Sequence, residues 1–344
     1  MKKIALIVDI EGWAFHLAAN LIKEALKTRF DVDIFYSKSE PFNENLIKIL
    51  EQVKNYDIIH FFWRKTLLPI CDSNIQEELA RKNIKVEDLK QKLSTGVYDH
   101  LFIGDSSYNE LFNTFCKKYV VSSQKLYDIY QNNSTIKNPD RILGDTFDER
   151  IFFPKYSERS LRQSADQLVI GWVGNSEWNN QLKDENGKPI DFKGYHTVLL
   201  PVIKELQSEG YHIQLYCADK KTNYIPSNEM CHYYRNIDIY TCVSISEGTP
   251  KPLLEAMGSG VATITTDVGV AKEYLGNKQQ EFILPAREIG KSEDKIKEEL
   301  KNKIIKLYND RKLLLELSQE NYEQSKYFNY QAYQQKYLDY FSNF

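Results

Sequence analysis

Residues 244–273, SISEGTPKPLLEAMGSGVATITTDVGVAKE, determine the fold that we predict for this chain. Residues 238–246, DIYTCVSIS, are rich in β-branched and aromatic side chains and are typical of a buried strand. The strand runs into a Gly-Pro loop, EGTPKP, at which a helix can begin with Pro252 in its first turn. Gly258 and Gly260 would end this helix before VATITT starts the next strand. The stretch therefore predicts a strand, loop, helix and strand of a parallel sheet.

Two glutamates stand around this junction between loop and helix. Glu247 lies in the loop, and Glu255 follows eight positions later, about one turn inside the helix. In open parallel sheets the carboxyl ends of the strands form the ligand crevice, and a helix that starts there offers unpaired N–H groups to an anion. One carboxylate can accept hydrogen bonds from a sugar while the other holds a ribose diol, which suits a nucleotide sugar. The structural alternative is an ordinary βαβ unit with two surface glutamates.

The match to known sequences extends well beyond the two glutamates. The second half of the chain resembles the donor region of glycosyltransferase family 4. The members of this family are retaining enzymes of the GT-B fold. The residues that carry this resemblance are 234–238 (YRNID), 246–248 (SEG), 254–257 (LEAM), Gly260, 266–269 (TDVG) and Glu273. Residues 148–154, DERIFFP, are similar to the segment by which this family enters its second domain.

The resemblance implies an α/β protein of GT-B architecture. Two Rossmann-like, doubly wound domains would enclose a cleft, and a C-terminal helix would return to the first domain. We expect an N-terminal acceptor domain over residues 1–157, a nucleotide-sugar donor domain over residues 158–325, and the returning helix over residues 326–344.

Length and composition agree with two α/β domains. The 344 residues are 42% hydrophobic and 27% charged, which is typical of a globular protein. The formal net charge of −3 gives no electrostatic reason to expect a nucleic acid partner. No run of about 18 apolar residues could span a membrane, and the N-terminus MKKIALIVDIEGWAF lacks the features of a signal peptide. We therefore expect a cytoplasmic protein, with peripheral association with the membrane as an alternative.

Apolar strands alternate with amphipathic helices along both halves, which predicts parallel sheets. In the first half we place strands at residues 4–9, 32–36, 58–63, 94–98, 119–122 and 141–143, with helices at 14–26 and 43–53. In the second half we place strands at residues 168–173, 213–217, 237–244 and 261–265, with helices at 195–209 and from 293 to about 318. Residues 175–192 are the most linker-like segment and would form a flap at the cleft.

The chain ends in an aromatic tail, YFNYQAYQQKYLDYF, whose Tyr and Phe side chains need a surface to cover. The resemblance predicts that this helix packs back on the first domain. A dimer contact and a membrane surface are the alternatives, and the sequence does not determine the oligomeric state.

The resemblance also assigns roles to residues of the donor region. Glu247 would orient the donor sugar, Glu255 would hold the ribose, and Lys193 would pair with the diphosphate at a helix start. The other residues that we expect to bind the donor are Gly248, Thr249, Pro250, Lys251, Pro252, Leu253, Gly174, Asn175 and Gly12.

One position of the donor site departs from the family pattern. The family carries an arginine soon after the glycine at position 174, where this chain has Asn175. The second cation for the diphosphate is therefore unassigned, and Lys251 and Arg235 are the possible substitutes.

Three weaker candidates lie in the first half. Gly12 follows the first strand, and a single glycine there either belongs to a tight turn or lets the backbone approach a ligand. Trp13 would stack on an acceptor sugar or be half-buried. His100 resembles a cleft histidine near the reacting sugar, although a lone histidine at a strand end is more often structural; His60 and His16 are weaker candidates still.

The resemblance implies a retaining glycosyltransferase that moves a sugar from a nucleotide diphosphate sugar to a hydroxyl of a glycan or lipid-linked glycan acceptor. Glu247, His100 and Lys193 would be its catalytic residues, and the leaving diphosphate would help to deprotonate the acceptor. We expect no cofactor and no metal, because no further ligands recur around Asp99 and His100 at zinc spacing. A setting in bacterial capsule or lipopolysaccharide assembly fits the composition. The alternatives are a non-catalytic nucleotide-sugar-binding subunit and another GT-B enzyme, either an inverting transferase or an epimerase.

Overall fold

The computed structural model describes residues 1–37, 41–101, 103–154, 167–177, 183–184, 186–288 and 293–344. The chain divides into two compact units, which are described separately. The first contains Met1–Thr146 together with Tyr330–Phe344, and the second contains Phe147–Asn329. Of the boundaries expected from the sequence, the one at residue 157 lies within residues 155–166, outside the described part of the chain.

The first unit is built on a parallel sheet, which has six strands among the described residues in the order β2-β1-β3-β4-β5-β6. Each predicted strand of this half is present within two residues of its predicted ends. The strands are β1 (Lys2–Val8), β2 (Phe30–Tyr36), β3 (Ile58–Phe61), β4 (Leu93–Val97), β5 (Lys118–Val121) and β6 (Arg141–Ile142).

Helices pack their apolar faces against this sheet. In α2 the buried side chains of Leu46, Ile47, Leu50 and Val53 recur at the spacing of one helix face, and they join the main core cluster of the unit. The helices before residue 146 are α1 (Ala14–Leu26), α2 (Phe42–Val53), α3 (Arg64–Leu67), η1 (Leu68–Cys71), α4 (Ser73–Arg81), α5 (Val86–Lys90), α6 (Ser106–Glu110), η2 (Leu111–Phe115) and α7 (Gln124–Gln131).

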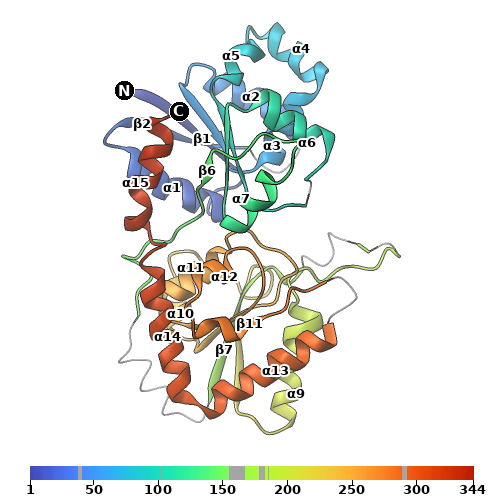
Figure 1. Cartoon of the computed structure of the whole chain (residues 1–344), viewed down its shortest axis with the longest axis vertical. Helices are drawn as coiled ribbons and strands as arrows, with labels where there is room; N and C mark the ends of the chain where they lie inside the picture. The colour runs from blue at the N-terminus through green and yellow to red at the C-terminus, as the bar shows by residue number, and fades with distance from the viewer. Residues whose placement is uncertain (38–40, 102, 155–166, 178–182, 185, 289–292) are drawn as a thin grey trace. The chain divides into compact units, whose positions relative to one another are not determined.

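The aromatic tail forms a last helix, α15 (Tyr330–Ser342), which belongs to the first unit and lies beside α1 (Figure 1). Its buried side chains are Tyr330, Tyr333, Tyr337, Tyr340 and Phe341. The tail is therefore covered by its own chain. This confirms the predicted return of the C-terminal helix to the first domain.

The second unit contains a parallel sheet that has five strands among the described residues, in the order β11-β10-β9-β7-β8. The strands are β7 (Leu168–Gly174), β8 (Ile213–Asp219), β9 (Ile239–Cys242), β10 (Ala262–Thr266) and β11 (Ile283–Leu284). The first four were predicted, whereas the sequence did not indicate the two-residue β11. The predicted strand at 237–244 is shorter than expected because side chains of Arg287 and Thr266 donate to the carbonyls of Val243 and Ser244.

The helices of the second unit differ from the prediction in two details. The helix expected at 195–209 is a π-helical turn followed by an α-helix, and the one expected from 293 to 318 is two helices that part at Asp310, which caps the second through the Leu313 N–H. The helices are η4 (Tyr195–Leu199), α9 (Leu200–Ser208), α10 (Met230–Arg235), α11 (Lys251–Gly258), α12 (Ala271–Tyr274), η5 (Gln279–Phe282), α13 (Glu293–Asn309) and α14 (Arg311–Ser325). Both α13 and α14 flank the second sheet (Figure 1).

Both sheets reverse their strand order next to their first strand. In the second unit β8 lies on one side of β7 and β9 on the other, and in the first unit β2 and β3 flank β1 in the same way. The crevice at such a reversal is the usual ligand site of an open parallel sheet. Within the described part of the chain, no helix is long and apolar enough to cross a membrane.

Candidate functional site

The predicted donor residues gather at the carboxyl edge of the second sheet. Gly174 ends β7, and the loop of residues 243–250 follows the neighbouring strand β9. These two strands are the pair at which the strand order reverses, so both loops border the crevice that the topology creates. Helix α11 begins at the end of the second loop.

Lys193 and Glu247 are brought together although 54 residues separate them. The N–H of Ile245 donates to the carbonyl of Phe192 at 2.9 Å, which holds the Lys193 segment against the loop after β9. The Lys193 Nζ then lies 2.5 Å from Oε1 of Glu247. The Ser244 hydroxyl donates to the same oxygen at 2.7 Å.

This ion pair is mostly shielded from water. The side chain of Lys193 is 21% exposed and that of Glu247 is 17% exposed. Burial by itself would lower the pKa of Lys193, but the adjacent carboxylate outweighs it and raises that pKa above its ordinary value. Lys193 therefore stays a cation at neutral pH.

Helix α11 presents its first turn beside Glu247. It begins at Lys251 with Pro252 in the first turn, as predicted. Its apolar side chains are buried in the unit, including that of Leu253, one of the residues that we expected to bind the donor. Gly258 is its last residue, and a Cβ at this position would lie 2.2 Å from the ring of Phe147. Close packing therefore requires a glycine where this helix ends.

Glu255 lies one turn inside α11 and is buried. Its Oε2 accepts a hydrogen bond of 3.0 Å from the Tyr234 hydroxyl. Burial raises the pKa of Glu255, and the charge of Lys251 and the bond from Tyr234 oppose that rise. Tyr234, which the sequence indicated only as part of a motif, thus orients this carboxylate.

Gly248 and Thr249 form the turn between the two glutamates. Gly269, in the loop after β10, has a φ of +50°, and a Cβ there would lie 1.8 Å from the carbonyl oxygen of Gly248. The N–H of Val270 donates to that oxygen at 3.2 Å. Thr249 and Pro250 are buried next to it. The loop that contains the TDVG motif therefore packs against the loop that carries Glu247.

Asn175 does not supply the positive charge that the family has near this position. Its side chain accepts a hydrogen bond from the Glu177 N–H at 3.1 Å and so shapes a local turn. Of the two predicted substitutes, Lys251 is the first residue of α11 and is buried near Glu255. Arg235 ends α10, and its guanidinium lies over the ring of Phe153 at 4.8 Å.

Two residues that the sequence did not indicate fix the loop after β7. Asp219 accepts hydrogen bonds from the N–H and the hydroxyl of Ser176, at 3.1 and 2.7 Å. Burial raises the pKa of Asp219, but these bonds and those from Thr222 and Lys221 outweigh burial and hold that pKa below its usual value. His196 is the second of these residues, and its Nε2 lies 3.1 Å from the carbonyl oxygen of Ser176.

Asp191 is a further residue that sequence reasoning missed. Its Oδ2 accepts from the N–H groups of His196 and Thr197, at 2.7 and 2.8 Å, and so caps the helical turn η4 directly after Lys193. Gly194 comes between them with a φ of +69°. An aspartate two residues before a Lys-Gly pair is the only signal in the sequence, and it is a weak one.

The predicted residues of the first unit lie at the carboxyl edge of its own sheet. Gly12 follows β1 with a φ of +79°, and its N–H donates to Nδ1 of His16 at 2.8 Å. The positive φ explains the glycine through the turn itself. Trp13 is the exposed residue that precedes α1.

His100 is exposed in the loop after β4. The preceding residue, Asp99, accepts two hydrogen bonds from the buried guanidinium of Arg64, at 2.6 and 3.1 Å. Because the carboxylate is committed to Arg64, it positions the loop that carries His100. His60 is buried instead: its Nδ1 lies 2.7 Å from the Ser94 hydroxyl, and burial lowers its pKa to about 3, so it stays neutral.

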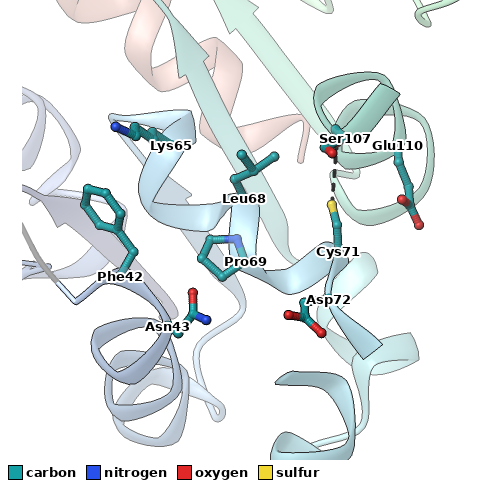
Figure 2. A pocket seen from close by; sticks show the side chains of 9 residues that line it. All are labelled: Phe42, Asn43, Lys65, Leu68, Pro69, Cys71, Asp72, Ser107 and Glu110. Atoms are coloured by element: carbon teal, nitrogen blue, oxygen red, sulfur yellow. Dashed lines mark hydrogen bonds between the residues drawn. The ribbon is translucent and has the colours of Figure 1, made fainter. Parts of the chain in front are cut away.

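A separate cavity of about 400 Å³ lies in the first unit (Figure 2). One side is apolar, and carboxylate, amide and hydroxyl groups stand around the rest. Phe42 packs edge to face on Trp63 with a ring distance of 5.6 Å, and the Lys65 ammonium lies over both rings. The residues that line the cavity are Phe42, Asn43, Lys65, Leu68, Pro69, Cys71, Asp72, Ser107 and Glu110.

Comparison with known proteins shows what the second unit and the whole fold are similar to. Residues 210–324 match the model of the family described as glycosyl transferases group 1. The curated protein CapJ of Staphylococcus aureus is 32% identical over 25% of this chain and 28% of its own length. The match thus spans little more than a quarter of CapJ.

Solved structures are similar over the whole chain. HepE of Anabaena, solved in complex with UDP-glucose, has a TM-score of 0.68 at 14% identity and is covered over 100% of both chains. Sucrose-phosphate synthase of Thermosynechococcus elongatus has a TM-score of 0.71 at 14% identity, over 100% of this chain and 99% of that one. The architecture is therefore that of the GT-B glycosyltransferases, with two Rossmann-like domains. Within the second unit, the match of residues 210–324 to the glycosyl transferases group 1 model agrees with the resemblance found in the sequence.

Proposed function

We propose that this protein is a retaining glycosyltransferase that moves a sugar from a nucleotide diphosphate sugar to an acceptor hydroxyl. The observation that carries this proposal is the Lys193–Glu247 pair at the carboxyl edge of the second sheet, beside the start of α11. Lys193 and the start of α11 suit the diphosphate of the donor, Glu247 suits its sugar, and Glu255, one turn into the helix, suits its ribose.

In this mechanism the diphosphate replaces Glu247 as the partner of Lys193. The negative charge that develops on the leaving diphosphate would be stabilised by the Lys193 ammonium and by backbone N–H groups around residues 248–253, a preorganised electrostatic effect. Lys251, at the same helix start, is our choice for the second cation, because Asn175 is neutral and Arg235 is stacked on Phe153.

The two carboxylates take different parts of the donor. Glu247, once released from Lys193, would accept hydrogen bonds from hydroxyls of the donor sugar. Glu255, oriented by Tyr234, would accept from the ribose hydroxyls. Both are binding roles that orient the reacting carbon.

We assign the acceptor's proton to the leaving diphosphate. We do not assign Glu247 as a covalent nucleophile, because the Ser244 hydroxyl donates to one of its oxygens and hydroxyls of the donor sugar would engage the carboxylate once Lys193 has left it. An oxygen of the departing diphosphate lies on the same face as the incoming hydroxyl and can take its proton, which accounts for retention. His100, exposed in its loop, would assist by contact with a sugar.

We place the acceptor, a glycan or lipid-linked glycan, on the first unit. Its cavity combines an aromatic wall at Phe42 with the carboxylates of Asp72 and Glu110, a lining that suits a neutral sugar ring. We extend the proposal to a role in bacterial capsule, lipopolysaccharide or other glycan assembly, the setting that we expected from the sequence.

The test is a thermal-shift panel of UDP-, GDP-, ADP- and CMP-linked sugars on the wild type and on Glu255→Ala. A donor that binds the folded protein raises its Tm by mass action. We expect one nucleotide to shift the wild type and not the variant, and we start with UDP-sugars because HepE was solved with UDP-glucose. No shift with any donor, in folded protein, would contradict the proposal.

Turnover and stereochemistry separate the remaining alternatives. With the donor known, proton NMR of the reaction with candidate acceptors reports the anomeric configuration of the product. A product of the same configuration as the donor supports retention, and an inverted product identifies an inverting transferase. Binding of the donor without turnover, with every acceptor offered, would favour a non-catalytic nucleotide-sugar-binding subunit.

A further inference from the structure

Arg287 is a buried arginine that no part of the predicted site included. It follows β11, at one side of the sheet, and only 3% of the residue is exposed. Its Nη1 donates to the carbonyl of Val243 at 2.9 Å, and its Nη2 donates to the carbonyl of Asp191 at 2.7 Å. The same Nη2 lies 3.2 Å from the Thr197 hydroxyl and from a carboxylate oxygen of Glu293.

The two carbonyls belong to the two segments that carry the ion pair. Asp191 is two residues before Lys193, and Val243 directly precedes Ser244, which donates to Glu247. The guanidinium therefore bridges the Lys193 segment and the end of β9. Because its donors form a rigid planar fork, the bridge sets the separation of the two segments.

The glycine after Lys193 fits this bridge closely. Gly194 has a φ of +69°, and a Cβ there would lie 2.3 Å from the Val243 carbonyl oxygen and 2.6 Å from Nη1 of Arg287. The Lys193 segment thus passes directly against the guanidinium and the strand end. A side chain at position 194 would push the Lys193 segment away from the Arg287 guanidinium and from the Val243 carbonyl.

The bridge is a costly way to stabilise a fold. Burying the guanidinium removes its hydration, and its ion-pair partner Glu293 remains 34% exposed, so that the pair compensates this cost only in part. Moreover, the Arg287 Nε is buried and has no hydrogen-bond partner among the described residues. The contacts of Arg287 are concentrated on the two segments of the site, as a positioning role requires.

We infer that Arg287 is a positioning residue of the donor site: it holds the Lys193 segment against the end of β9, so that the Lys193 ammonium is placed to meet the diphosphate. The inference rests on the proposed function, because it assumes that Lys193 binds the donor. Arg287 itself touches no substrate and acts through backbone carbonyls.

The test compares Arg287→Met and Arg287→Lys with wild type in the full chain. Calorimetric titration with UDP and UMP, or with the same pair of whichever base the donor panel selects, separates diphosphate contacts from base and ribose contacts. We expect Arg287→Met to weaken UDP binding about tenfold and to leave UMP binding within twofold, because the Glu255 end of the site is intact. Turnover of the donor should fall about 10²-fold, as expected for a misplacement near 1 Å. Arg287→Lys can reach only one of the two carbonyls, so its UDP affinity and its turnover should lie between those of the wild type and those of Arg287→Met.

Asn321→Ala is the matched control for a general loss of stability. Asn321 is fully buried in α14, and its side-chain amide donates to the Val261 carbonyl at 2.8 Å, just before β10 and at the opposite edge of the sheet. This variant should lower the Tm of the second unit without changing the ratio of UDP to UMP affinity. If Arg287→Met changes that ratio no more than Asn321→Ala does, Arg287 is merely structural and the inference is wrong.

Two further variants keep the outcomes distinct. Thr197→Val removes one acceptor of the Arg287 Nη2 with little change in volume, and it replaces Arg287→Met if that protein does not fold. A loss of affinity for UDP but not for UMP supports the inference. An unchanged ratio of UDP to UMP affinity overturns it. Lys193→Met tests the underlying proposal. If Lys193→Met leaves UDP binding unchanged, the proposed function fails first; if it weakens UDP and Arg287 variants do not, only the inference about Arg287 fails.

Discussion

Lys193→Met and Glu247→Gln, alone and combined, should show that the ion pair of the site is energetically coupled before any ligand binds. Exposed pairs contribute roughly 0.2–1 kcal/mol, whereas breaking a fully buried pair costs about 3–5 kcal/mol. With side chains 21% and 17% exposed, this pair lies between the two cases. We therefore expect a coupling free energy of about 1–2 kcal/mol from the double-mutant cycle.

Differential scanning calorimetry of the full chain measures this coupling. For a unit of this size, each kcal/mol corresponds to a shift of about 2–4 °C in Tm, so the two single variants should together lose about 2–8 °C more than the double variant loses. The sign of the pH dependence follows from the raised pKa of Lys193. Its stabilising contribution is complete below the ordinary value of 10.5 and is lost only as the pH rises through the higher folded pKa. The coupling should therefore be the same at pH 7 and pH 9.

The control is a cycle on Lys278 and Glu316, a pair in the same unit whose ammonium and carboxylate lie 2.6 Å apart but whose side chains are 56% and 36% exposed. Its coupling should be clearly smaller, and it should weaken further in high salt. A Lys193–Glu247 coupling no larger than that of the control would refute the reasoning, because the two residues would then behave as independent surface charges.

Three further predictions address the fold, the metal and the first unit. Gly194→Ala should destabilise the second unit by about 2–4 kcal/mol, because strain at positive φ adds to the contact with the Val243 carbonyl; Gly210→Ala, which has a positive φ but open space, should cost only about 1 kcal/mol by calorimetry. Donor turnover should persist after chelation with EDTA and dialysis, whereas a loss that Mg²⁺ restores would contradict the predicted metal independence. His60, whose pKa burial lowers to about 3, resists protonation in the folded protein, so below the ordinary pKa of 6.5 it opposes folding, by about 2 kcal/mol at pH 5. His60→Gln should flatten the acid side of the stability profile of the first unit.

The sheets were predictable from the sequence because their signal is local. Runs of apolar or β-branched residues such as those in β7 and β10 occur between amphipathic segments, and the burial of β10 on both faces follows from the parallel topology. The exceptions are equally physical. Strand β11 has only two residues, which is too short for a pattern, and β9 ends early because side chains, not a neighbouring strand, bond the carbonyls that follow it.

The donor site was predictable only in part, since family resemblance names residues and not their contacts. Lys193 and Glu247 could each be identified from motifs, but their pairing depends on a backbone bond between Phe192 and Ile245. Arg287 gave no signal at all. It bonds residues 44 and 96 positions away, and such distances carry no periodicity that a single sequence could reveal.

The pairing of Lys193 with Glu247 has a consequence for which ligands the site can accept. Each charge is shielded and already has a partner, so a ligand that engages only one of them leaves the other without its counterion, at a cost in free energy. A free diphosphate would pair with Lys193 and leave Glu247 without its cation. A free sugar would bond to Glu247 and leave Lys193 without its anion. Only a molecule that carries both groups at the right separation replaces both partners together. Under the proposed function, the Lys193–Glu247 pair therefore favours a complete nucleotide sugar over either of its parts, because only the complete donor compensates both charges for the contact that it breaks.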